Sequence, residues 1–187
     1  ILIYASNGRF YTLPADKLPS GRGFGEPVRL LVEIPNDADI TAMMVWQPDQ
    51  RLLLASRDGR GFIVPSSEIL AQTRNGKQVM TVEDNADAVF CAVIEPRHDY
   101  VAVIGNNRKM LVFKLDQIPE MGKGKGVILQ KYKDAHFSDA KTFNLKEGLT
   151  FLSGTREFSV PSVKEWMGER AQAGKLPPNG FPKRNKF

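Results

Sequence analysis

The chain has 187 residues, enough for one large hydrophobic core or two small ones. Apolar residues make up 42% of it and charged residues 25%, a composition that is typical of globular proteins and excludes a disordered chain. No apolar run approaches the ~18 residues that a membrane-spanning helix needs. The single cysteine, Cys91, excludes a disulfide framework.

The formal net charge of +5 is unevenly distributed along the chain. Residues 1–98 carry a net −2, whereas residues 99–187 carry a net +7. This asymmetry predicts an electropositive surface in the second half, where a polyanion would bind most strongly. The chain begins within the apolar run Ile1–Tyr4 and shows no signal-peptide pattern, so we expect a segment of a longer protein from the reducing cytoplasm.

An internal repeat organises the sequence. Four arginines, at intervals of 51, 48 and 48 residues, each begin a similar short apolar segment: Arg9, Arg60, Arg108 and Arg156. The same offsets relate Gly25, Gly76 and Gly124. We therefore divide the chain into the repeats 1–50, 51–98, 99–146 and 147–187.

Each repeat reads as a series of short strands. Two apolar runs flank a turn rich in Asn, Asp or Gly, which is typical of a β-hairpin. These hairpins are predicted at 1–5 with 10–13, 52–55 with 62–64, 101–104 with 110–113, and 149–152 with 158–160. A glycine-containing loop leads to a third strand at 28–34, 79–82 and 127–129, and a fourth follows at 40–46, 89–94 and 140–143. An all-β fold of propeller blades is therefore predicted, because four short strands recur about every 48 residues.

Helical periodicity is scarce: Ser66–Gln72 and Asp116–Met121 could each form a single turn, and a longer helix is predicted in the C-terminal repeat alone. Ser162–Ala173 is predicted as a short helix, because Ser162 can cap it and Glu165 follows three residues later. The tail, residues 175–187, contains three prolines, one glycine and four basic residues, and is expected to be extended or disordered.

The sequence offers no catalytic constellation. His98 and His136, the two histidines, share no metal-binding spacing with each other or with Cys91, so no metal site is predicted. Motifs for an activated nucleophile or a nucleotide phosphate are absent. We predict no catalytic residue and no cofactor for these residues.

Basic side chains accompany the glycine-rich loops of three successive repeats, at 20–27, 73–78 and 121–126. Glycine allows the backbone to approach a phosphate and Arg or Lys supplies charge, although such a loop can also be merely solvated. Lys131 and Lys133 extend the third loop, and Lys183 and Arg184 add charge in the tail. Contacts of this kind are made to the nucleic-acid backbone and carry no sequence information.

Two of these loops carry a resemblance that spans the whole chain. With its repeats, its Gly21–Pro27 segment (Gly-Arg-Gly-Phe-Gly-Glu-Pro) and its Pro119–Gly126 segment (Pro-Glu-Met-Gly-Lys-Gly-Lys-Gly), the sequence resembles the C-terminal domain of the A subunit of bacterial type IIA topoisomerases. The likeness is greatest to topoisomerase IV (ParC). It implies a single domain over residues 1–187, folded as a broken β-propeller or β-pinwheel of about four four-stranded blades that binds and bends duplex DNA on a basic rim.

The gyrase A subunit has a similar domain that carries the box Gln-Arg-Arg-Gly-Gly-Lys-Gly in one loop. Here Glu120–Gly126 retains only the final Gly-Lys-Gly, which favours topoisomerase IV. The resemblance implies a catalytically silent domain of an ATP-dependent isomerase whose ATP and Mg²⁺ bind elsewhere. It also implies cytoplasmic, nucleoid-associated partners (duplex DNA, the rest of the A subunit and the B subunit) and no membrane.

By position in the repeats and by the resemblance, we predict the following residues as DNA contacts: Arg22, Arg74, Lys77, Arg108, Lys109, Lys123, Lys125, Lys131, Lys133, Lys183 and Arg184. Arg108 recurs at a turn and could instead pin its hairpin. Three alternatives remain open: a DNA-wrapping gyrase A C-terminal domain, a propeller that binds a protein partner through an apolar patch, and a propeller enzyme.

Overall fold

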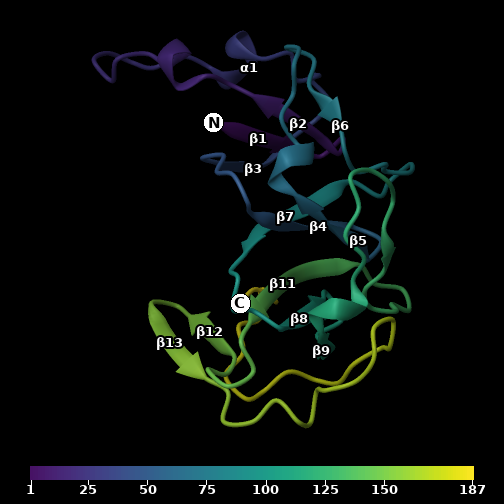
Figure 1. Cartoon of the computed structure of the whole chain (residues 1–187). Helices are drawn as coiled ribbons and strands as arrows, with labels where there is room; N and C mark the ends of the chain where they lie inside the picture. The colour runs from purple at the N-terminus through teal and green to yellow at the C-terminus, as the bar shows by residue number, and fades with distance from the viewer.

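The computed structural model describes all of residues 1–187, whose strands form small antiparallel sheets that follow one another along an arc (Figure 1). Blade 1 has the strand order β3-β1-β2-β6, with β1 at Leu2–Ala5, β2 at Arg9–Thr12, β3 at Ile40–Met44 and β6 at Lys77–Gln78. Blade 2 has the order β7-β4-β5-β10, with β4 at Arg51–Ser56, β5 at Arg60–Pro65, β7 at Ala88–Ile94 and β10 at Val127–Ile128.

The blades become less complete toward the C-terminus. Blade 3 has three strands in the order β11-β8-β9, with β8 at Tyr100–Gly105, β9 at Met110–Lys114 and β11 at Phe137–Phe143. The last repeat contributes a hairpin of β12 (Thr150–Ser153) and β13 (Arg156–Ser159). The helical elements are one turn each: η1 (Ala15–Lys17), α1 (Val28–Leu31), η2 (Ser66–Glu68) and η3 (Leu115–Gln117). The predicted all-β blades are thus confirmed, although only two of them have four strands.

Each blade is completed by the repeat that follows it. β6 pairs with β2 of the preceding blade, and β10 pairs with β5 in the same way. At blade 3 the equivalent edge is made by isolated bridges, of which Met110 with Lys175 is one. β7 contacts both β3 and β11, so these three strands lie on the inner side of the arc and β6 and β10 on the outer side. Because each repeat supplies the outer strand of the preceding blade, backbone hydrogen bonds link consecutive blades.

The blades stack face to face, which explains why their strands read as continuous apolar runs. In β4, Leu52 and Leu54 pack toward blade 1, whereas Leu53 and Ala55 pack toward blade 3. All four are fully buried. A strand whose two faces are both covered needs apolar residues at every position, because successive side chains point to opposite faces.

Non-strand segments cover the two outer blade faces. Residues 28–38, which include α1, pack over Ile3 and Tyr11 on the face of blade 1 that points away from blade 2. The predicted strand at 28–34 is therefore wrong. Its counterparts β6 and β10 pair with a preceding hairpin, and the 187 residues contain no hairpin before β1.

The helix predicted in the C-terminal repeat is also wrong. Ser162–Ala173 forms no helix, because its backbone bonds to blade 3 instead: Val112 N–H donates to Trp166 O at 2.8 Å, and Gly168 N–H donates to Val112 O at 2.8 Å. The tail forms no helix or strand, in agreement with the extended alternative, and it is anchored on the blades. Phe181 is 4% exposed and packs with Trp166 in the core that covers blade 3.

A recurring glycine marks the point where each outer edge crosses to the preceding blade. Gly76, Gly126 and Gly174 have φ values of 78°, 78° and 82°, and each lies against the backbone carbonyl of Phe10, Gly61 or Met110, respectively. A side chain at any of the three would collide with that carbonyl. The structure therefore aligns Gly76 with Gly126, and the sequence alignment of Gly76 with Gly124 is two residues out of register.

Candidate nucleic-acid interface

The hairpin turns of blades 2 and 3 lie side by side and are joined by one aromatic ring. Tyr132 sits between them, and its ring is so close to Gly59 and Gly105 that a side chain at either glycine would collide with it. Burial raises the pKa of the Tyr132 phenol, so the ring is neutral. Its neighbours Lys131 and Lys133 are exposed. We call this surface, formed by residues 57–59, 105–109, 131–138 and 183–187, the turn face.

Hydrogen bonds hold the segments of the turn face in place. Asn106 N–H donates to His136 O at 3.0 Å, and His136 N–H donates to Asn106 Oδ1 at 2.9 Å. Phe137 N–H donates to Arg57 O at 2.9 Å. Burial, Arg57 and Lys186 together lower the pKa of His136 below its usual value. The charges of Arg57 and Lys186 therefore oppose protonation of the imidazole.

The C-terminal tail crosses the turn face and is clamped there. The Arg108 guanidinium donates to Pro182 O at 2.9 Å, to Asn185 Oδ1 at 3.0 Å and to Phe181 O at 3.3 Å. Ser138 Oγ donates to Asn185 O at 2.8 Å. The clamp leaves the side chains of Lys183 and Arg184 exposed beside the turns.

Five of the predicted DNA contacts meet at this face. They are exposed and take part in none of the ion pairs of the structure: Lys109, Lys131, Lys133, Lys183 and Arg184. Arg57 and Lys186 join them as exposed cations. Arg57 was missed because it precedes an ordinary Asp-Gly turn. Lys186 could have been included, since it continues the basic run of the tail.

The other predicted contacts are placed differently. Arg108 is the tail clamp: its guanidinium bonds to the C-terminal tail and not to its own hairpin. Arg74 donates to Leu30 O at 3.1 Å, Lys77 Nζ lies 3.8 Å from Glu68 Oε2, and Lys125 pairs with Glu83. Arg22 and Lys123 are exposed without an ion pair.

The three glycine-rich loops do not form one row. The second and third lead into β6 and β10 on the outer edges of blades 1 and 2. The first, which contains Arg22, leads into α1 and lies beside blade 1, far from the turn face (Figure 1). The first glycine-rich loop is therefore not equivalent in position to the other two.

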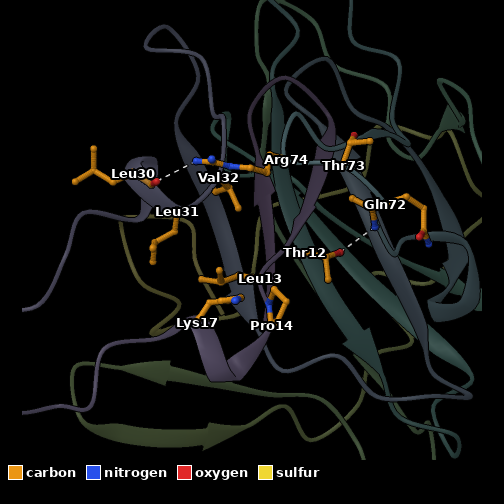
Figure 2. Close-up of a pocket in the computed structure, with 11 residues that line it drawn as sticks. Thr12, Leu13, Pro14, Lys17, Leu30, Leu31, Val32, Gln72, Thr73 and Arg74 are labelled. Carbon is orange, nitrogen blue, oxygen red and sulfur yellow. Dashed lines mark hydrogen bonds between the residues drawn. The ribbon is translucent and has the colours of Figure 1, made fainter.

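The largest cavity, about 510 Å³, lies between α1 and the segment before β6 (Figure 2). Its lining includes Leu13, Leu31, Lys17 and Arg74 but no histidine, cysteine or carboxylate. Figure 2 shows Arg74 reaching across to the carbonyl of Leu30. The cavity thus brings together no carboxylate, histidine or cysteine.

Two further features bear on function: whether metal-binding side chains cluster, and whether any helix is long enough to span a membrane. No group of three or more His, Cys, Asp or Glu side chains could hold a metal ion. His98 instead bonds through Nδ1 to Thr142 Oγ1 at 2.8 Å. No helix is long and apolar enough to cross a membrane.

Comparisons with known proteins agree with this architecture. The model of the DNA gyrase C-terminal domain, a beta-propeller, matches residues 1–47, 50–95 and 99–137. The A subunits of DNA topoisomerase 4 from Rickettsia bellii and Caulobacter vibrioides are 49% and 43% identical to the chain over its whole length. That from Escherichia coli K12 is 35% identical over 94% of the chain. The chain spans about a quarter of the length of these relatives.

Solved structures of related domains share the fold of this chain. The Escherichia coli ParC C-terminal domain superimposes with a TM-score of 0.82 at 27% identity, covering 97% of this chain and 77% of that one. A gyrase A C-terminal domain superimposes with a TM-score of 0.68 at 14% identity, covering 93% of this chain and 58% of that one, which shows the shared fold. The chain therefore belongs to the family of gyrase-type C-terminal β-propeller domains, among those of the topoisomerase IV A subunit.

Proposed function

We propose that this domain binds duplex DNA through the turn face, without sequence specificity, and bends it. In this role it would help a topoisomerase IV to select the DNA that it decatenates or relaxes. The observation that carries the proposal is the group of seven exposed cations on the turn face, none of which is in an ion pair. Side chains of this kind suit phosphate contacts, which position a protein without reading bases.

Counterion release would supply most of the affinity. Each phosphate that a Lys or Arg neutralises releases condensed cations, so the logarithm of the association constant falls linearly with the logarithm of salt concentration. Five to seven contacts predict a slope of roughly −4 to −6. No element of the turn face is a helix that could enter the major groove, which supports backbone binding.

Bending follows from the position of the cations on two blades. Arg57 lies on the turn of blade 2, whereas Lys109 lies on the turn of blade 3 and Lys183 on the tail beyond it. The blades follow an arc, so a duplex that touched all of these side chains would curve with it (Figure 1). The additional phosphate contacts that the curved duplex makes would offset the elastic cost of the bend.

The rest of the reaction is assigned to other parts of the parent subunit. We infer that these residues perform no catalysis and hold no cofactor. ATP and Mg²⁺ would act elsewhere in the assembly of A and B subunits, on the nucleoid of the bacterial cytoplasm. The lining of the largest cavity, which contains no carboxylate, histidine or cysteine, is consistent with this division.

A salt titration tests the proposal. Fluorescence anisotropy would measure binding to a duplex of ~40 base pairs, long enough to bend, between about 50 and 200 mM salt. Lys131→Glu with Lys133→Glu should weaken binding by about tenfold or more and reduce the slope by about 2. Binding without a salt slope would refute the proposal.

The matched control is Lys17→Glu with Lys114→Glu. Both lysines are exposed, and Lys114 lies at the end of β9 opposite the turn face. The control changes the net charge by the same amount, so it should retain most of the wild-type slope. An equal loss in both double variants would show that net charge, and not the turn face, determines binding.

A further inference from the structure

Two basic side chains on the outer edges of blades 1 and 2, Lys77 and Lys125, differ from the exposed cations of the turn face, because each has a carboxylate partner. Lys125 pairs with Glu83, and the two side chains are 50% and 60% exposed. Lys77 Nζ lies 3.8 Å from Glu68 Oε2. Lys77 and Lys125 are thus locally neutralised, whereas the seven exposed cations of the turn face are in no ion pair.

Backbone bonds fix the Glu83 pair. The loop that carries Lys125 runs beside the segment after β6: Gly124 N–H donates to Val79 O at 3.0 Å, and Thr81 N–H donates to Gly124 O at 2.9 Å. These bonds bring Lys125 alongside the next turn, which is closed by Ala86 N–H donating to Glu83 O at 3.0 Å. The fold therefore places the Lys125 and Glu83 side chains within reach of each other.

The surroundings of Glu83 favour its charged form. The hydrogen bond and the charge of Lys125 lower the pKa of the Glu83 carboxyl, and the charge of Arg60 lowers it further. Arg60 Nε in turn lies 3.7 Å from Asp58 Oδ2. Two carboxylates thus face two cations at this seam, and Glu83 remains ionised at neutral pH.

We propose that Glu83 is a specificity-determining residue of the DNA interface: it occupies Lys125 in place of a DNA phosphate and so confines the duplex to the turn face. This inference rests on the proposed function. A phosphate approaching Lys125 must displace Glu83 and then remain near a freed carboxylate that repels it. Lys125 therefore contributes little to binding, and Lys123 is the one lysine of this loop that has no ion pair.

The variant that tests this role is Glu83→Gln, which keeps the shape of the side chain and removes its charge. Lys125 then becomes available for one more phosphate, so the salt slope should steepen by about 1 and affinity at low salt should rise about threefold. Glu165→Gln is the control, because Glu165 is exposed, has no ion pair and changes the net charge equally.

A double-mutant cycle assigns the gain to Lys125. In the Lys125→Ala background, Glu83→Gln should have no more effect than Glu165→Gln. The inference would be overturned if the gain in DNA affinity persisted without Lys125, or if Glu165→Gln reproduced it. The proposed function would remain intact in either case. Wild-type protein that shows no salt-dependent binding would instead refute the proposed function.

Discussion

The guanidinium of Arg108 donates a hydrogen bond of 2.9 Å to the carbonyl oxygen of Pro182, 74 residues further along the chain. This bond and its companions at Phe181 and Asn185 hold the tail across the turn of blade 3. Arg108 has a φ of 61°, which is uncommon for a residue with a side chain. Its task is thus to position the cations of the tail, and its charge is not free for a phosphate.

Replacing Arg108 by Ala should release the tail. Three carbonyl or amide oxygens would lose a charged donor, at a cost of about 1.5–3 kcal/mol in the free energy of unfolding. Urea denaturation measures the cost, and hydrogen exchange of residues 181–187 reports the release. DNA affinity should fall as well, because Lys183 and Arg184 would no longer be held at the turn face. Unchanged exchange in the tail would contradict the clamp.

The sequence predicted the blades because their strands carry two independent signals, turn residues and continuous apolar runs. It could not predict which strand closes which blade. β6 and β10 are two residues long, and their partners β2 and β5 belong to the preceding repeat. Pairing across repeats leaves no local pattern, so Val28–Leu31 looked like a strand although it forms α1.

The basic character of the interface was predictable from composition. Whether each Lys or Arg is paired with a carboxylate was not. Lys125 and Lys133 are both exposed lysines near the same loop, and only the fold brings Glu83 to Lys125. The helix predicted at Ser162–Ala173 failed for a related reason. The capping signal of Ser162 and Glu165 is worth about 1 kcal/mol, less than the edge bonds that Val112 offers this segment.

Tyr132→Phe should leave the protein at least as stable as the wild type. The Tyr132 hydroxyl is buried without a hydrogen-bond partner, which costs free energy, whereas the ring fills the space between Gly59 and Gly105. Removing the hydroxyl should raise the free energy of unfolding by up to about 1 kcal/mol and leave DNA binding unchanged. Tyr132→Ala, by contrast, should cost about 3 kcal/mol, because the ring is lost. Urea denaturation of the two variants measures these free energies of unfolding. A marked loss of stability in Tyr132→Phe would argue against an unpaired hydroxyl.

Gly126→Ala should loosen the junction between blade 2 and the loop that completes it. The new methyl group would meet the Gly61 carbonyl, and alanine is itself strained at a φ of 78°. We expect a loss of about 2–4 kcal/mol, from the strain and the displaced β10 pairing together. Gly180→Ala is the control: its φ is 84°, but no atom lies within 4 Å of the added methyl group. It should lose only about 1–2 kcal/mol from the backbone conformation. Equal losses in thermal or urea denaturation would mean that the contact with Gly61 is unimportant.

Asp139 makes stability depend on pH. Burial raises the pKa of its carboxyl above the usual value, although the Phe187 and Ala140 N–H groups and the charges of Lys186 and Arg184 oppose the shift. A carboxyl with a raised pKa in the folded state is protonated more readily there than in the unfolded chain. Its contribution is therefore most favourable at acid pH, below the unfolded pKa, and is lost as the pH rises through the folded value.

Asp139→Asn should accordingly stabilise the protein at pH 7, where the wild-type carboxylate bears the cost of burial. The amide oxygen can still accept the bond from Phe187 N–H, which the wild-type Oδ2 accepts at 2.9 Å. The gain should shrink toward about pH 4, where the wild-type carboxyl becomes protonated. Urea midpoints of both proteins at the two pH values measure the difference. A gain of the same size at both would show that the titration of Asp139 does not contribute.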